Sequence, residues 1–403
     1  MAFVIGVGQT PVRQGGERTH AELAAEAVGA AIADAGLDPH DLDAVWFASP
    51  SLGRFGGTTG APILHGAIPD GLPVIDVGFG GAAIHGGWMG ITAGQHHLVI
   101  AVGVDRAPAD PIAAADAEIA VPAEWEGPPS AHDRQRFGRR QARASGDPGW
   151  APAADRPLAV DLGALEARYA LRSGSVSRAD LAAVVAKSRA AGAKNDRALL
   201  RTPIAADALL AEPRWVEPLG RSMVAVPADG AAAVIIASEL GLARLRSRAR
   251  AIRIASIAIG GGTFRALGER PGVSRVASRA FGLAGVTPGT VDLAELADPT
   301  AWSELRALDA LGLGSLGEVA TATRAGDTAP TGRRPINPSG GMLSGGDAGA
   351  ASGIARFAEV VTQLRREAGP RQATNARRAV VHDGRGLTGF DDAVCAVAVL
   401  RAD

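Results

Sequence analysis

Three residues in the last third of the chain carry side chains suited to acid–base chemistry. Asp298 and Asp347 each lie where a helix is expected to begin, and His382 lies in a predicted strand. Carboxylates and imidazoles are the side chains that most often move protons in active sites. Two carboxylates sharing one partly buried site would raise the pKa of one of them, so the pair could act as acid and base. The alternative for each aspartate is a structural role as a helix N-cap.

Other candidate reactive residues have structural interpretations. His382 and Asp383 are neighbours, and consecutive residues of a strand point to opposite faces, so a structural histidine is the alternative to an acid–base pair. Cys395 is the single cysteine and lies in an apolar run, which indicates a core residue and excludes an intramolecular disulfide. His96 and His97 have no further ligands beside them in the sequence, so we expect no metal site.

Glycine-rich segments are candidates for binding a ligand through the backbone. Gly340, Gly341 and Gly346 belong to the segment NPSGGMLSGGDAG, and Gly80 belongs to a similar turn after the run PVIDV. Because these residues have no side chain, the backbone can approach a ligand closely. Close contacts between helices would also require glycine, and that alternative stays open.

The elements that must position these residues alternate between strands and helices. Apolar runs predict strands at 2–8, 43–48, 73–77 and 96–103. Thr19 and Glu22 have the spacing of a capping box, and Gly36 is placed to end the helix predicted over 20–35. A small-residue helix is expected from about Gly80 to Ala93. This alternation predicts a parallel or mixed sheet covered by helices.

The second half of the chain repeats this order, which indicates an internal duplication. Strands are predicted at 249–262, 378–386 and 391–400, and DLAELAD (292–298) takes the place of DAVWFASP. We predict an N-terminal half over 1–240 and a C-terminal half over 245–403. An insertion over about 107–215 is expected to be loop-dominated up to 160, with helices near 159–172 and 178–193, and such an insertion could cover a ligand site.

Composition excludes several classes of protein. The 403 residues are 47% hydrophobic and 21% charged, with a formal net charge of -1, which is typical of a globular protein rather than a nucleic-acid binder. The start of the sequence has no signal-peptide pattern, and no apolar run is long enough to span a membrane. We therefore expect a cytoplasmic protein.

Several segments together resemble the thiolase superfamily, and within it the sterol-carrier-protein-type thiolases. The similarity is carried by VIGVGQTPV, HAELAAEAVGAAIADAGLDPHDLDAV, AVGVDR, VPADGAAAVIIAS, VDLAELAD and NPSGGMLSGGDAGAASG, in this order. The resemblance implies an α/β thiolase fold, in which two βαβαβαββ halves form a five-layered α-β-α-β-α sandwich with an inserted loop domain. It also implies a dimer that binds acyl-CoA, and the Arg-rich stretch from Arg134 to Arg143 could meet the phosphates of CoA; a solvated helix face is the alternative.

The residues that match the family's catalytic motifs depart from them. The nucleophilic cysteine of the family stands at a helix N-terminus, where Val77 stands here. The histidine that supports the oxyanion hole matches Ala297, with Asp298 kept beside it. Asp347 replaces the histidine that activates the thiol, and His382 falls near the C-terminal acid–base position. The resemblance therefore implies that ordinary thiolase activity is absent.

Two kinds of function follow from this pattern. The chain could be a catalytically silent subunit of an acyl-CoA-processing complex, paired with an active thiolase paralogue or a small OB-fold protein. Alternatively, it could be an acyl-CoA enzyme with altered chemistry, either retro-aldol carbon–carbon cleavage or acyl transfer without cysteine. Asp347, Asp298 or His382 would then be the base, and a coenzyme A thioester would be the ligand, with no other cofactor.

Overall fold

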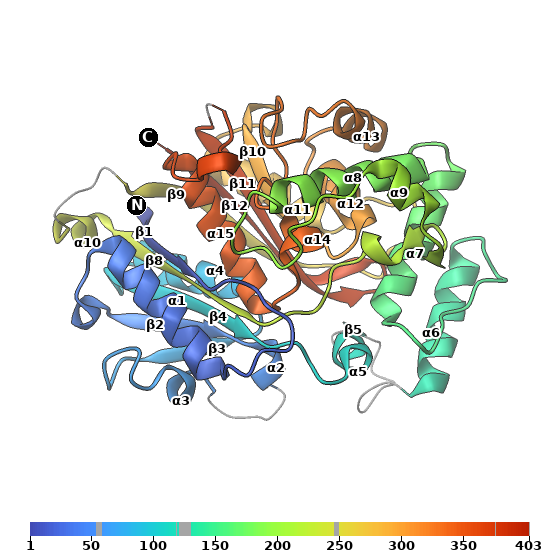
Figure 1. The fold of residues 1–403 in the computed structure, drawn as a ribbon. Helices are drawn as coiled ribbons and strands as arrows, with labels where there is room; N and C mark the ends of the chain where they lie inside the picture. Colours follow the sequence, from blue (N-terminus) through green and yellow to red (C-terminus); the bar gives the residue numbers. More distant parts are fainter. Residues whose placement is uncertain (54–58, 118, 121–129, 246–249, 375, 403) are drawn as a thin grey trace.

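The computed structural model describes residues 1–53, 59–117, 119–120, 130–245, 250–374 and 376–402 (Figure 1). The start of the predicted strand over 249–262 and part of the predicted insertion lie outside these residues. The elements of the N-terminal half are β1 (Ala2–Gln9), α1 (His20–Ala35), β2 (Ala44–Ala48), α2 (Pro50–Gly53), α3 (Gly60–Leu64), β3 (Val74–Val77), α4 (Gly80–Thr92), β4 (Leu98–Asp105), β8 (Gly230–Ser238) and α10 (Glu239–Ala243).

The C-terminal half has a similar order of elements, although its described residues include no strand equivalent to β3. Its elements are β9 (Ile252–Gly261), α11 (Val273–Ala284), β10 (Leu293–Leu296), α12 (Ala301–Ala310), α13 (Leu316–Arg324), α14 (Gly341–Gly345), α15 (Ala350–Leu364), β11 (Arg378–Thr388) and β12 (Asp391–Arg401).

Helix α1 begins and ends where the sequence predicts. The hydroxyl of Thr19 accepts a hydrogen bond from the backbone of Glu22, and the carboxylate of Glu22 accepts one from the backbone of Thr19. At the other end Gly36 adopts φ 64°, a left-handed conformation that glycine takes without steric cost. Local chemistry therefore defines both ends of this helix.

The strands of the two halves are ordered alike. In the first half the order is β3-β2-β4-β8-β1, and in the second it is β10-β11-β12-β9. β2 runs parallel to β3 and β4, and β10 runs parallel to β11, whereas β8 and β12 are antiparallel to their neighbours. The counterpart of β3 is reduced to one parallel bridge between Ala294 and Ile336.

One aspartate in each half makes the same pair of hydrogen bonds, which supports the predicted duplication. Oδ2 of Asp43 accepts from the backbone N–H groups of His97 and Leu98 at 2.5 and 2.9 Å. Oδ2 of Asp292 accepts from those of Arg377 and Arg378 at 2.9 and 2.8 Å. Each carboxylate thus fixes the start of the next parallel strand in its own half.

Five layers result from packing helices between and outside the two sheets (Figure 1). Buried residues of α4 and α15 form one hydrophobic cluster with both sheets, so these helices are the central layer. Helix α1 covers the outer face of the first sheet, and α11 and α12 cover that of the second. The sheets are joined where β1 pairs antiparallel with β9 through Ala2, Phe3 and Val4.

The residues between β4 and β8 contain more helix than the sequence suggests. They form α5 (Pro111–Asp116), β5 (Ile119–Ala120), α6 (Ala131–Ala144), α7 (Leu158–Arg172), α8 (Arg178–Gly192), α9 (Ala206–Ala211), β6 (Arg214–Val216) and β7 (Leu219–Gly220). The expectation of a loop-dominated stretch over 107–160 is therefore wrong for α6, which begins at a capping box formed by Ser130 and Asp133. The sequence did not predict this helix because its apolar periodicity is weak. The helix is stabilised instead by its cap and by the buried Phe137.

The inserted helices lie along the C-terminal half (Figure 1). Val184 and Val185 of α8 belong to the same hydrophobic cluster as Leu305 and Leu308 of α12. Strand β5 pairs in parallel with the distal end of β11. Among the described residues no helix is long and apolar enough to cross a membrane.

Candidate functional site

A carboxylate occupies the N-terminus of the central helix α4. Val77, the residue that the resemblance matches to the nucleophile, ends β3, and α4 begins at Gly80. Oδ2 of Asp383, from β11 of the other half, accepts a hydrogen bond of 2.7 Å from the backbone N–H of Gly81. Arg356 donates to Oδ1 of the same carboxylate at 2.6 Å. Asp383 is buried, so this helix end is already bound to an anionic group of the chain itself.

A second carboxylate occupies the N-terminus of the other central helix. Oδ2 of Asp105, at the end of β4, accepts a hydrogen bond of 2.8 Å from the backbone N–H of Ala350 in α15. Its Oδ1 accepts from the hydroxyl of Ser49 at 3.0 Å and from the backbone of Ser51 at 3.1 Å. Burial raises the pKa of Asp105, and the nearby Arg385 counteracts part of that rise. Each half thus supplies the cap for the other half's central helix.

Asp347 lies immediately before α15 and remains accessible. Its Oδ1 accepts a hydrogen bond of 3.0 Å from the backbone N–H of Gly349, as expected for a helix cap. Nη1 of Arg385 lies 4.0 Å from the same oxygen, and the Asp347 side chain is 32% exposed. This carboxylate is available to a ligand in a way that Asp105 and Asp383 are not.

Asp298 also meets a helix start, but in full burial. Its Oδ1 accepts a hydrogen bond of 2.7 Å from the backbone N–H of Met342, while its buried Oδ2 has no hydrogen-bond partner in the described part of the chain. Burial and the nearby Glu304 raise the pKa of Asp298 to about 7. No hydrogen bond or ion pair joins Asp298 to Asp347, so the structure does not make them a bonded acid–base pair. Ala297, beside it, bonds the carbonyl of His382 through its backbone.

Further buried acids surround Asp298, and the sequence analysis did not single them out. Burial and the charge of Glu359 raise the pKa of Glu295 to about 8, although Ser339 donates to both of its oxygens. Glu304 is paired with Lys187 at 2.6 Å. The one signal in the sequence is that Lys187 is one of only two lysines, and charged residues inside apolar runs are rarely buried without a partner.

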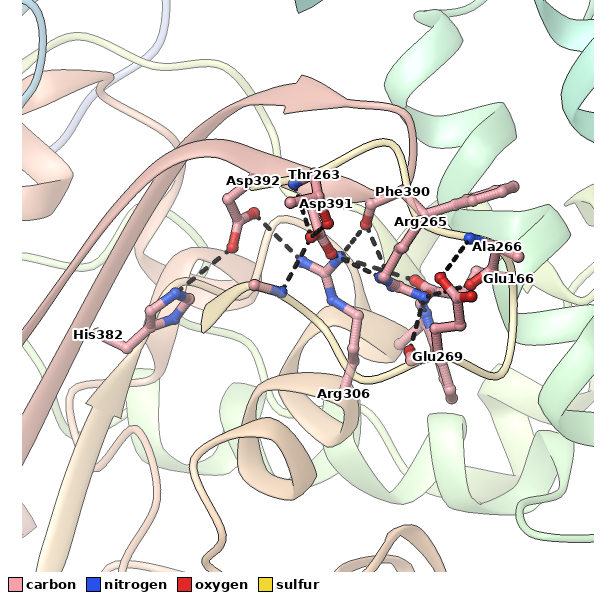
Figure 2. Close-up of polar contacts among 12 residues, drawn as sticks. Glu166, Thr263, Arg265, Ala266, Glu269, Arg306, His382, Phe390, Asp391 and Asp392 are labelled. Atoms are coloured by element: carbon pink, nitrogen blue, oxygen red, sulfur yellow. Dashed lines mark hydrogen bonds and ion pairs between the residues drawn. The ribbon is translucent and has the colours of Figure 1, made fainter. Parts of the chain in front are cut away.

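His382 is buried beside a network of charged residues (Figure 2). Its Nε2 lies 3.5 Å from Oδ2 of Asp392, and neither ring nitrogen makes a hydrogen bond to any residue that the structure describes. Asp392 also lies 3.2 Å from Arg306. Although burial disfavours its charge, Arg306 and His382 hold the pKa of Asp392 at about 2. The side chains of His382 and Asp383 have separate partners, as the alternation of a strand predicts.

The same network ties the insertion to the β11–β12 hairpin (Figure 2). Arg265 pairs with Asp391 at 2.6 Å and with Glu166 of α7. Glu166 also accepts a hydrogen bond of 2.8 Å from the indole of Trp302. These residues come from four separate stretches of the sequence, so no spacing in the sequence could reveal the network.

Three of the predicted binding glycines make close contacts. A Cβ on Gly80 would stand 2.5 Å from the carbonyl oxygen of Ala350, one on Gly340 would stand 2.9 Å from Gly192, and one on Gly341 would overlap the carboxylate of Asp298. Gly341 and Gly346 also line a cavity of about 70 Å³. The two central helices therefore approach each other closely at Gly80, as in the alternative in which glycine serves contact between helices.

Cys395 and the arginine-rich helix show no catalytic feature. Cys395 is buried, and burial raises the pKa of its thiol above the ordinary value, which disfavours the reactive thiolate. Arg134 of α6 points inward and pairs with Asp116 at 2.7 Å. Arg139, Arg140 and Arg143 are exposed on the same helix.

Comparison with known proteins assigns this chain and its fold to a family. A family model described as thiolase C-terminal domain-like matches residues 266–398. Sterol carrier protein 2 of Homo sapiens is 35% identical over 163 residues, which cover 38% of this chain and 30% of that protein. The solved Ltp2-ChsH2(DUF35) aldolase has a TM-score of 0.78 at 22% identity, covering 100% of this chain and 98% of that chain.

A solved SCP2-thiolase-like protein type 1 from Mycobacterium smegmatis has a TM-score of 0.70 at 19% identity, covering 100% of this chain and 77% of that chain. An acetyl-CoA acetyltransferase of Methanothermobacter thermautotrophicus is 30% identical over 403 residues, which cover 96% of each chain. The chain therefore belongs to the thiolase superfamily, within which it resembles the sterol-carrier-protein-type thiolases.

Proposed function

We propose that this chain is a thiolase-fold subunit of an acyl-CoA-processing complex that does not itself carry an acyl group. The observation that supports this most directly is the carboxylate of Asp383 on the N-terminus of α4. A thiolase uses such a helix end to stabilise a thiolate and an acyl oxyanion. A resident anion uses the same backbone donor and the same positive end of the helix dipole. Val77 in addition offers no nucleophile.

The proposed setting is a heteromer, although a homodimer is also compatible with the exposed surface. The benzoylsuccinyl-CoA thiolase subunit BbsB of Thauera aromatica is 29% identical over 207 residues, which cover 50% of this chain. In the described structure β3 pairs only with β2, which leaves its other edge without a strand partner. Ile75 of β3 and Met89 of α4 are exposed large apolar residues. An active thiolase paralogue or a small OB-fold protein is the proposed partner.

Covalent labelling tests whether the chain carries an acyl group. Purified wild type, Val77→Cys, and Val77→Cys combined with Asp383→Asn would be incubated with radiolabelled acetyl-CoA and examined by intact mass. We expect no label on wild type or on the single variant, because the Asp383 carboxylate still occupies the helix end. Label on the double variant would support the role of Asp383, whereas a stoichiometric acyl adduct on wild type would refute the proposal.

A second candidate function rests on Asp347, which is 32% exposed and lies 4.0 Å from Arg385. In retro-aldol cleavage of a 3-hydroxyacyl-CoA, this carboxylate would remove the proton of the 3-hydroxyl group. The C2–C3 bond would then break, a carbonyl product would leave, and the acyl-CoA enolate would take a proton back from Asp347. Arg385 would stabilise the negative charge of the enolate. The name of the aldolase with a similar fold agrees with this chemistry.

The two candidates are separated by a lyase assay with a medium-chain 3-hydroxyacyl-CoA, alone and with a co-purifying partner. For a lyase, Asp347→Asn should abolish carbonyl release, whereas Asp298→Asn should retain it because Asp298 is fully buried. Calorimetric titration with CoA and acyl-CoA would show whether the ligand binds. If acyl-CoA binds but the 3-hydroxyacyl-CoA is not cleaved, with or without the partner, the lyase proposal fails. The role of a subunit that carries no acyl group would then remain.

A further inference from the structure

A cavity of about 70 Å³ lies beside the first turns of α15. It is bounded by the end of β1, the segment 195–198, α14 and one side of α15. Three charged residues in its lining are themselves buried: Glu295, Arg356 and Glu359, which are 0%, 6% and 3% exposed. Buried charges in a cavity wall are costly unless each is paired, so their partners indicate what else the cavity could bind.

The protein itself satisfies both buried acids. Glu359 accepts hydrogen bonds from Arg371 at 3.0 and 3.2 Å and from Gln363 at 2.8 Å. Glu295 accepts from the backbone and the hydroxyl of Ser339, both at 2.9 Å. Neither carboxylate needs a cation from solution.

The donors in the cavity wall are not satisfied to the same degree. Nη1 of Arg356 donates to Asp383, but Nη2 meets only the thioether sulfur of Met342 at 2.8 Å, a weak acceptor. Nε of Arg356 has no hydrogen-bond acceptor among the described residues. The half-buried Arg197 likewise has no polar partner for its guanidinium in the described part of the chain. The groups in the cavity wall that could still bind a ligand are therefore guanidinium N–H donors, which carry positive charge.

We propose that this cavity is a binding site for a short-chain carboxylate, held by the guanidinium groups of Arg356 and Arg197. A guanidinium matches the planar geometry of a carboxylate with two parallel donors. The small apolar residues Val12, Ala351 and Ala355 line the rest of the cavity and suit a short alkyl group. Because Arg356 also holds Asp383, a bound carboxylate would act on the cap of α4.

The protonation state of Glu295 in the cavity wall should make carboxylate binding depend on pH. Burial raises the pKa of Glu295 to about 8, so this side chain is largely neutral at pH 7 and does not repel an anion. Deprotonation above that pH places a negative charge in the wall. Carboxylate binding should accordingly weaken as the pH rises past 8, because the anion then has to bind beside a charged Glu295.

The test is calorimetric titration of the full chain with acetate and propionate, at pH 6.5 and pH 9, with inorganic phosphate as the comparison anion. We expect saturable binding of the carboxylates at the lower pH and about tenfold weaker binding at the higher pH. Arg197→Gln should weaken binding about tenfold, the loss of one charge-assisted contact. Arg201→Gln is the matched control, since Arg201 is exposed four residues further along the chain and does not line the cavity.

Glu295→Gln is a second variant, which tests the pH dependence separately from the arginine contact. Glutamine mimics the neutral acid, so this variant should bind the carboxylates equally at both pH values. The proposal is overturned if wild type shows no saturable binding at millimolar carboxylate, if phosphate binds more tightly than acetate, or if Arg197→Gln binds like wild type.

Discussion

Asp105 and Asp383 play the same physical role on opposite halves of the molecule. Each is a buried carboxylate from a strand of one half that accepts a backbone N–H at the start of the other half's central helix. The positive end of a helix dipole and its unpaired N–H groups favour such an anion. These two contacts therefore join each central helix to a strand of the other half.

At the same scale, Asp298 should make stability depend on pH. Its folded pKa of about 7 lies above the 3.8 of an unperturbed aspartate. The folded state therefore keeps a proton that the unfolded chain releases, and stability should fall as pH rises from about 4 to about 7. Asp298→Asn removes this dependence and should be more stable than wild type at pH 8, on the order of 2–4 kcal/mol.

Urea unfolding at pH 5, 6, 7 and 8 measures this difference. Asp70→Asn is the control, because it removes a charge from a side chain that is 89% exposed. Parallel stability curves for wild type and Asp298→Asn would contradict the assigned direction of the pKa shift.

At the scale of elements, α7 of the insertion is held to the C-terminal half by the buried network of Figure 2. Glu166 pairs with Arg265 and accepts a hydrogen bond from Trp302. Glu166→Gln would leave Arg265 with one fewer negative partner in a buried position. Breaking a buried ion pair in this way costs about 3–5 kcal/mol, so we expect a loss of stability in that range.

Urea unfolding gives the total effect, and hydrogen exchange of α7 shows where it acts. Glu26→Gln is a matched control, since its ion pair with Arg18 is 42–43% exposed and should contribute at most about 1 kcal/mol. Equal effects of the two substitutions would show that the network does not fasten the insertion.

At the scale of the whole molecule, the two halves form one structure, and among the described residues the terminal strand β3 pairs only with β2. α15 packs against strands of both halves, and β1 pairs with β9. The open edge is β3, whose Ile75 is 37% exposed. Unpaired edge strands favour association with another chain.

Ile75→Lys should therefore weaken any assembly formed through this edge, because lysine opposes strand pairing and burial there. Light scattering coupled to size-exclusion chromatography would give the mass of wild type and variant, with Leu240→Lys as a control at an exposed residue of α10. A wild-type oligomer that persists in the Ile75 variant would place the interface elsewhere.

The sequence determined the features that depend on local chemistry and pattern. Thr19, Glu22 and Gly36 fixed the ends of α1, and apolar runs located most strands within a few residues. Repeated order of elements indicated the duplication, and the matched segments indicated the fold. Local signals suffice here because caps and burial patterns act within one turn or one strand.

Only the tertiary structure decided which charged residues meet. Asp383 and Gly81 are 302 positions apart, and Asp105 and Ala350 are 245 apart. Asp298 and Asp347 looked equivalent in the sequence, yet one is fully buried with an unpaired oxygen and the other is accessible beside Arg385. Burial and long-range pairing set the pKa values of these acids, and long-range pairing also places carboxylates at the helix ends. Both effects depend on packing between the halves, which residue spacing in the sequence does not reveal.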